Sequence, residues 1–133
     1  MSDNNVINKA MNIKSHRLSK KEIDDNFSDL HAPLSAIEAL IEADRCYFCY
    51  DAPCTKACPS DIDVPGFIQS IRSDNLTGAA EKILSENIFG GMCARDCPTE
   101  ELCQQACVRN DHEEKPVEIG SLQRYATDSV LNN

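Results

Sequence analysis

Eight cysteines arranged in two groups constrain this chain of 133 residues more than any other feature. The first group reads Cys46-x2-Cys49-x4-Cys54-x3-Cys58-Pro59. The second group reads Cys93-x3-Cys97-x5-Cys103-x3-Cys107. Grouped thiols act as disulfide partners in an oxidising compartment and as metal ligands in a reducing one. Whether these cysteines form disulfides or bind metal therefore depends on the compartment of the protein.

The N-terminal residues indicate a reducing compartment. Residues 1–20 read MSDNNVINKAMNIKSHRLSK and lack the run of about seven apolar residues that a signal peptide needs. No stretch approaches the roughly eighteen apolar residues of a transmembrane helix. We expect a cytoplasmic protein whose thiols stay reduced and bind metal. Its net charge of −9 disfavours nucleic acids and anionic membranes as partners, because both require a basic face.

The cysteines could form disulfides, bind zinc or hold iron–sulfur clusters, and their spacing bears on which of these three roles they have. The expected compartment argues against disulfides. Zinc sites favour Cys-x2-Cys pairs, often with His. Cys46 and Cys49 form such a pair, but the second group has none, and His16, His31 and His112 lie away from the cysteines in sequence.

The first group has the layout of a ferredoxin run, Cys-x2-Cys-x2-Cys-x3-Cys-Pro, with two residues added before its third cysteine. In two-cluster ferredoxins the last cysteine of the run ligates the other cluster. By that logic Cys46, Cys49 and Cys54 hold one cluster and Cys58 belongs to a second. Symmetry suggests that Cys107 crosses back to the first cluster. Eight thiols suffice for two 4Fe–4S clusters, which is the interpretation that the spacing favours.

The apolar spacing predicts an all-α fold without useful strand patterns. Ser35 and Glu38 form a capping box that begins a helix leading to Cys46. Its apolar positions are Leu34, Ile37, Leu40 and Ile41. We expect residues 1–32 to form a polar arm, flexible or as one loosely docked helix, and residues 33–133 to form a domain around both clusters.

An αα-hairpin is expected between the two cysteine groups. Its first helix begins near Pro65 and its second near Asp74 or Asn75, and Gly90-Gly91 ends that segment. A short helix is expected over 98–107, and a last one from Gly120 or Ser121.

Three segments carry a resemblance to a known family. Residues 42–71 read EADRCYFCYDAPCTKACPSDIDVPGFIQSI, residues 78–109 read GAAEKILSENIFGGMCARDCPTEELCQQACVR, and residues 116–128 read PVEIGSLQRYATD. Together they resemble the N-terminal iron–sulfur domain shared by dihydropyrimidine dehydrogenase and the small subunit of glutamate synthase. The resemblance implies an all-helical domain wrapped around two 4Fe–4S clusters.

The resemblance also implies which residues ligate iron. The first cluster would be bound by Cys46, Cys49, Cys54 and Cys107. The second would be bound by Cys58, Cys97, Cys103 and the side chain of Gln123. Counting thiols alone would use Cys93, whereas the resemblance leaves Cys93 free and uses Gln123. A Gln at this position favours the pyrimidine branch, because the glutamate synthase subunits tend to carry Glu in a similar setting.

The functional expectation is an electron-transfer module rather than a complete enzyme. None of the five glycines forms G-x-G-x-x-G, and no nucleophile set suggests catalytic residues. The resemblance places FAD and NAD(P)H in a following domain or partner, which would pass electrons through this module to a catalytic pyrimidine dehydrogenase subunit or a glutamate synthase large subunit. A structural zinc module is the alternative of another class.

Four basic residues stand within two positions of an expected ligand: Lys56, Arg95, Arg109 and Arg124. They either offset the negative charge of the clusters or are ordinary surface charges. The sequence leaves this choice open.

Overall fold

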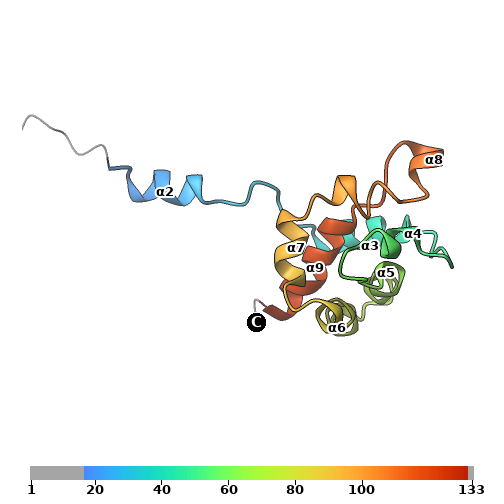
Figure 1. The fold of residues 1–133 in the computed structure, drawn as a ribbon. Coiled ribbons are helices and arrows are strands. Elements are labelled where there is room, and N and C mark those ends of the chain that lie inside the picture. Colours follow the sequence, from blue (N-terminus) through green and yellow to red (C-terminus); the bar gives the residue numbers. More distant parts are fainter. Residues whose placement is uncertain (1–16, 132–133) are drawn as a thin grey trace, which may run out of the picture. The chain divides into compact units, whose positions relative to one another are not determined.

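The computed structural model describes residues 17–131, and every regular element within that range is helical. The contacts divide the chain into two units, residues 1–32 and residues 33–133. The first unit contains α2 (Lys20–Asn26). The second contains α3 (Ala36–Asp44), α4 (Pro53–Lys56), α5 (Val64–Arg72), α6 (Leu76–Glu86), α7 (Gly90–Asp96), a 3-10 helix (Thr99–Glu101), α8 (Asn110–Glu113) and α9 (Ile119–Leu131) (Figure 1). The all-α prediction is confirmed.

Helix α2 is held by local contacts within the first unit. The backbone N–H of Glu22 donates to Ser19 Oγ, and the Glu22 carboxylate accepts from the backbone N–H of Ser19. This reciprocal pair satisfies two amides that the helix start would leave unpaired. The helix buries none of its residues.

Helix α3 has the predicted start but buries an unexpected face. Ser35 and Glu38 form the capping box, as the sequence predicts. The residues that α3 buries are Ala39 and Ala43, whereas Ile37 and Ile41 are exposed. The apolar spacing therefore indicates the helix correctly but not its inward face. The small alanine side chains fill that face, which lies against α5 and α9.

Helices α5 and α6 form the predicted αα-hairpin and lie side by side (Figure 1). Asp63 and Asn75 cap the two helices by accepting hydrogen bonds from the backbone N–H groups of Gly66 and Gly78. The facing sides are apolar and buried: Phe67, Ile68 and Ile71 on α5, and Ala79, Ala80 and Ile83 on α6. The hairpin supplies much of the core beneath the cysteines.

Gly90 and Gly91 begin a helix as well as ending the hairpin segment. This helix, α7, runs alongside α9 (Figure 1), and both glycines are buried. A Cβ atom at Gly90 would lie 2.4 Å from Ile83 Cγ2, so only glycine permits this approach of α7 to α6. The helix expected over 98–107 is reduced to the 3-10 helix, and turns follow it to residue 106.

Helix α9 is the centre of the second unit. It contacts α3, α5, α6 and α7, and it buries Ile119, Leu122 and Ala126. Its start agrees with the prediction to within two residues. Because α9 touches every longer helix of the unit, a side chain on its inner face can reach the segments that carry both cysteine groups.

Candidate functional site

Cys46, Cys49, Cys54 and Cys107 line one cavity. Cys46 and Cys49 lie in the loop after α3, Cys54 lies in α4, and Cys107 precedes α8. Phe48 and Ala52 adopt positive φ angles of 51° and 40°, which turn this loop back on itself. The structure therefore brings three thiols of the first group together with one thiol of the second.

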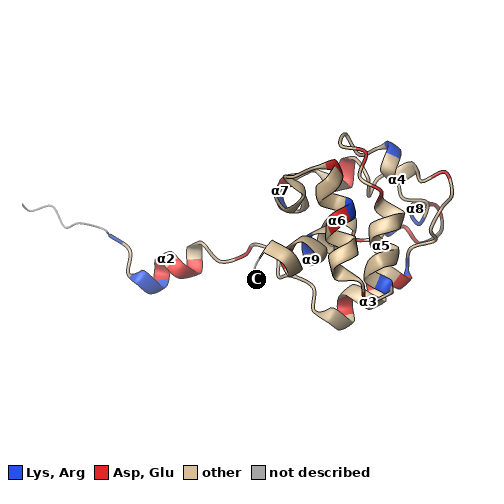
Figure 2. Cartoon of the chain, turned by 90° about the horizontal axis from the view of Figure 1, so that it is seen from below, with Lys and Arg blue, Asp and Glu red and all other residues tan. Residues whose placement is uncertain are grey.

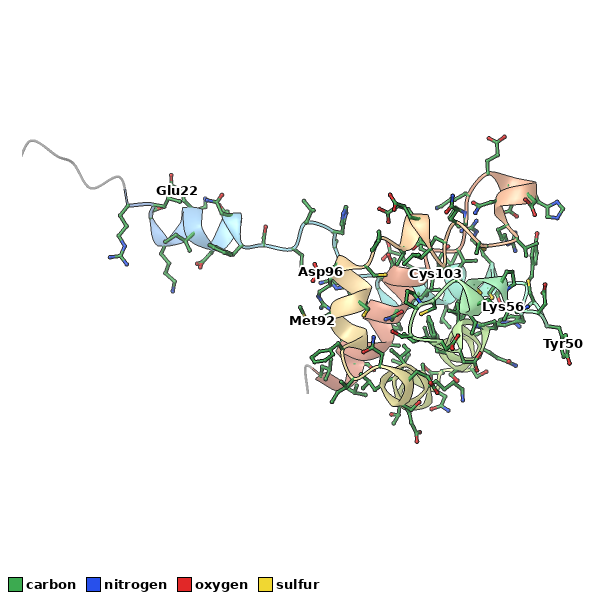
Figure 3. All side chains as sticks on the ribbon, in the orientation of Figure 1. Glu22, Tyr50, Lys56, Met92, Asp96 and Cys103 are labelled. Atoms are coloured by element: carbon green, nitrogen blue, oxygen red, sulfur yellow. The ribbon has the colours of Figure 1, made fainter. Side chains whose placement is uncertain are left out.

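The rest of the cavity wall is mostly apolar. Val64 and Ile68 of α5 contribute to it, as do Val117, just before α9, and Ile119, the first residue of α9. Arg109 is the charged residue among its lining side chains. Figure 3 shows the side chain of Tyr50 pointing away from the unit, and this exposed residue does not line the cavity.

A second set of thiols consists of Cys58, Cys97 and Cys103. Burial, together with the neighbouring thiols of Cys58 and Cys97, raises the pKa of Cys103 to about 12. Cys103 lies inside the unit in Figure 3. Cys54 of the first set also contributes to this shift, so the two sets are neighbours.

Gln123 lies on α9 and is only 7% exposed. Its Nε2 donates a hydrogen bond of 2.7 Å to the carbonyl oxygen of Gly90 at the start of α7. No hydrogen bond to its Oε1 is present within residues 17–131. The amide is thus fixed through its nitrogen, and its oxygen remains available as a ligand.

Cys93 has a different environment. Asn87 Nδ2 lies 3.2 Å from Cys93 Sγ and 3.1 Å from Ser60 Oγ, so it can donate to both. Cys93 is also close enough to Cys97 to raise the pKa of that thiol, although burial is the larger cause. The sulfur of Cys93 therefore takes part in a contact that links the start of α7 to the segment after Cys58.

Burial makes two thiols of the first set, Cys46 and Cys54, weaker acids than a free cysteine. It raises the pKa of Cys54 to about 11, and it also raises the pKa of Cys46. Metal binding would have to displace protons from such thiols, as it does at other cysteine sites. Within residues 17–131, no three His, Cys, Asp or Glu side chains are grouped so that they could hold one metal ion. The first set surrounds a shared cavity instead, and an all-thiol donor set with apolar walls suits an iron–sulfur cluster.

The four basic residues near the thiols have different surroundings. Lys56 is exposed. Nη2 of Arg95 donates to both carboxylate oxygens of Asp128 at 2.8 and 2.9 Å, and Nε of Arg124 lies 3.3 Å from the same carboxylate. Arg109 alone of the four lines the first cavity. Sequence reasoning missed Arg45, which contacts Arg109 through its backbone carbonyl, because nothing in its local pattern distinguishes it.

Other candidate ligands and surfaces add little to the site. Neither His31 nor His112 lines the cavity, and His16 lies outside the described residues. Figure 2 shows acidic and basic residues interspersed over the helices of the second unit. Within residues 17–131, no helix has the length and apolarity needed to cross a membrane.

Comparisons with known proteins identify the family of the chain. Residues 23–133 match the family described as dihydropyrimidine dehydrogenase domain II, 4Fe-4S cluster. The chain is 48% identical over 104 residues to the NAD-dependent dihydropyrimidine dehydrogenase subunit PreT of Escherichia coli O157:H7, covering 78% of this chain and 24% of that protein. The PreT protein of Salmonella typhimurium gives the same identity and coverage.

A more distant relative is the putative oxidoreductase UacF of Escherichia coli K12, which is 33% identical over 116 residues, covering 86% of this chain and 18% of that protein. The chain thus spans about a quarter or less of the length of these relatives. The family match extends over most of the chain and includes all eight cysteines. This chain therefore belongs to the family of 4Fe–4S cluster domains named for domain II of dihydropyrimidine dehydrogenase.

Proposed function

We propose that the chain is an electron-transfer module that carries two 4Fe–4S clusters between a flavin centre and a partner redox subunit. The observation that carries the proposal is the meeting of Cys46, Cys49, Cys54 and Cys107 around one cavity. Each cluster, when bound, would accept and donate one electron at a time. The protein would fix its position and exclude water through the apolar wall.

The two ligand sets are part of the proposal. Cys46, Cys49, Cys54 and Cys107 hold the first cluster. Cys58, Cys97, Cys103 and Gln123 hold the second, with Cys93 outside both sets. The proximity of Cys58 and Cys97 to Cys103 supports the second set. The open Oε1 of the buried Gln123 supports its fourth member.

The partners follow from the relatives and from what the sequence lacks. PreT is named as an NAD-dependent dihydropyrimidine dehydrogenase subunit, and this chain has no dinucleotide-binding glycine motif. We place FAD and NAD(P)H in a following domain or a partner, which delivers electrons to the clusters. A catalytic pyrimidine dehydrogenase subunit then receives them in the cytoplasm. A glutamate synthase large subunit is the alternative acceptor.

Cluster content tests the proposal. Protein purified without air should be brown and contain about eight iron and eight acid-labile sulfide per chain, as two 4Fe–4S clusters require. Dithionite reduction should produce paramagnetic signals from both clusters. The structural zinc module predicts zinc without sulfide, and that result would refute electron transfer by this chain.

A further inference from the structure

We propose that Arg109 is a positioning residue for the first cluster, closing its thiol site and keeping its reduction potential high. The inference rests on the proposed function, because it concerns the cluster held by the first thiol set. It starts from the position of Arg109 in the cavity wall, where its side chain is only 14% exposed.

Arg109 contacts residues on both sides of Cys46. Its Nε donates to the backbone carbonyl oxygen of Arg45, and its guanidinium carbon lies 4.0 Å from the centre of the Tyr47 ring. Its Nη1 donates to the carboxylate of Glu113 in α8. One planar group two residues after Cys107 thus holds the two neighbours of Cys46, which brings distant parts of the sequence together.

Arg45 reinforces this connection with its own side chain. Its Nη1 and Nη2 donate to the carbonyl oxygens of Pro116 and Lys115 at 2.9 and 2.8 Å. Its Nη2 also lies 3.1 Å from Glu113 Oε2. Arg45 and Arg109 therefore share Glu113 and link the end of α3 to the segment 109–116. This arrangement holds Cys46 next to Cys107 through the protein's own contacts.

The charge of Arg109 has a second effect. A guanidinium remains protonated at any working pH, and burial reduces its screening by water. A cluster with four thiolate ligands is anionic and becomes more negative on reduction. A fixed cation beside it therefore favours the reduced state. Glu113 opposes this effect, but its side chain is 41% exposed, so water screens its charge more strongly.

The variants separate the charge of Arg109 from its shape. Arg109→Gln removes both, whereas Arg109→Lys keeps the charge and loses the planar fork. Glu113→Gln removes the opposing charge at an exposed position. Arg72→Gln is the matched control, because Arg72 also pairs with a carboxylate and lies 5.6 Å from the Phe48 ring, but it is 53% exposed and does not line the cavity.

Redox titration monitored by electron paramagnetic resonance measures the reduction potential of each cluster. The rate of iron loss to a chelator measures the stability of the site. The signal that Gln123→Cys leaves unmoved is assigned to the first cluster. Arg109→Gln should shift that potential downward and speed iron loss severalfold. Arg109→Lys should lose iron faster with a smaller shift, and Glu113→Gln should shift the potential upward. Arg72→Gln should leave both quantities near wild type.

If Arg109→Gln and Arg72→Gln show the same potential of the first cluster and the same rate of iron loss, the inference is overturned. The proposed function would still stand in that case, because the wild type would contain both clusters. A wild type without iron and sulfide would overturn both proposals. If Arg109→Gln retains no first cluster, Glu113→Gln decides the electrostatic part: an upward shift supports it, and an unchanged or lowered potential refutes it.

Discussion

Gln123 and Cys93 are the two residues that could complete the second thiol set, and their contacts differ. Gln123 is fixed by the Gly90 carbonyl with its oxygen left open. Cys93 accepts a hydrogen bond from Asn87, which also contacts Ser60. A serine at position 93 could accept the same bond, so Cys93→Ser changes the chemistry of the sulfur while keeping its local contact.

The first prediction ranks two substitutions. Cys93→Ser should keep both clusters, because a cysteine outside the ligand sets contributes packing and one weak hydrogen bond. Gln123→Ala should leave one iron without its protein ligand and make the second cluster easy to lose. Iron and sulfide content per chain measures both effects. Loss of a cluster in Cys93→Ser, with Gln123→Ala unchanged, would reverse the assignment.

A third substitution at the same position tests the sign of the electrostatics. Gln123→Cys replaces a neutral amide by a thiolate and makes the second cluster one charge more negative. That cluster should become harder to reduce, so its potential should fall. Redox titration of the variant and the wild type measures the difference. A raised potential would show that Gln123 does not ligate this cluster.

At the scale of helices, the sequence predicts what depends on neighbouring residues. The caps at Ser35 and Asn75 lie within three residues of the amides they satisfy, so local pattern is sufficient to find both helix starts. The inward face of α3 depends on how closely α5 and α9 approach, which no local pattern records. For the same reason the sequence predicts only the end of a segment at Gly90, whereas α7 begins there.

A substitution in that contact should destabilise the fold. Gly90→Ala would place a Cβ atom 2.4 Å from Cγ2 of the fully buried Ile83. Overpacking of this kind costs about 1–3 kcal/mol of unfolding free energy. Denaturant midpoints of the cluster-loaded protein, followed by circular dichroism, measure the loss.

The double variant Gly90→Ala/Ile83→Leu is the control for this contact. Leucine has no Cγ2 methyl on its β carbon and keeps the apolar volume, so it should recover part of the stability. A double variant that is less stable than the sum of the two single changes would show that the contact is not the cause.

At the scale of the whole molecule, the clusters should be required for folding. The core is small, and the first thiol set joins the segment after α3 to the segment before α8. Domains with such metal-linked segments often have no stable metal-free state. Removing iron with a chelator should therefore abolish most of the helical circular dichroism. A metal-free chain that retains full helicity and melts cooperatively would contradict this expectation.

The sequence predicts the grouping of the thiols better than it predicts the residues that surround them. Spacing within the first group already separates Cys58 from Cys46, Cys49 and Cys54, and the structure places Cys107 with those three. The same spacing cannot rank four nearby cations, because the position of a guanidinium depends on long-range contacts. Only the fold distinguishes Arg109 in the cavity wall from Arg95 and Arg124 beside Asp128.

Because the two cysteine groups mix in the fold, the chain cannot be cut between them without dividing both thiol sets. Cys107 lies with thiols of the first group, and Cys58 lies with thiols of the second. A break in the turn between α5 and α6 would give two fragments, each holding part of both thiol sets. Neither fragment could complete either set alone. With the proposed ligand sets, neither fragment should hold a cluster by itself, and separate fragments should gain clusters only by associating with one another.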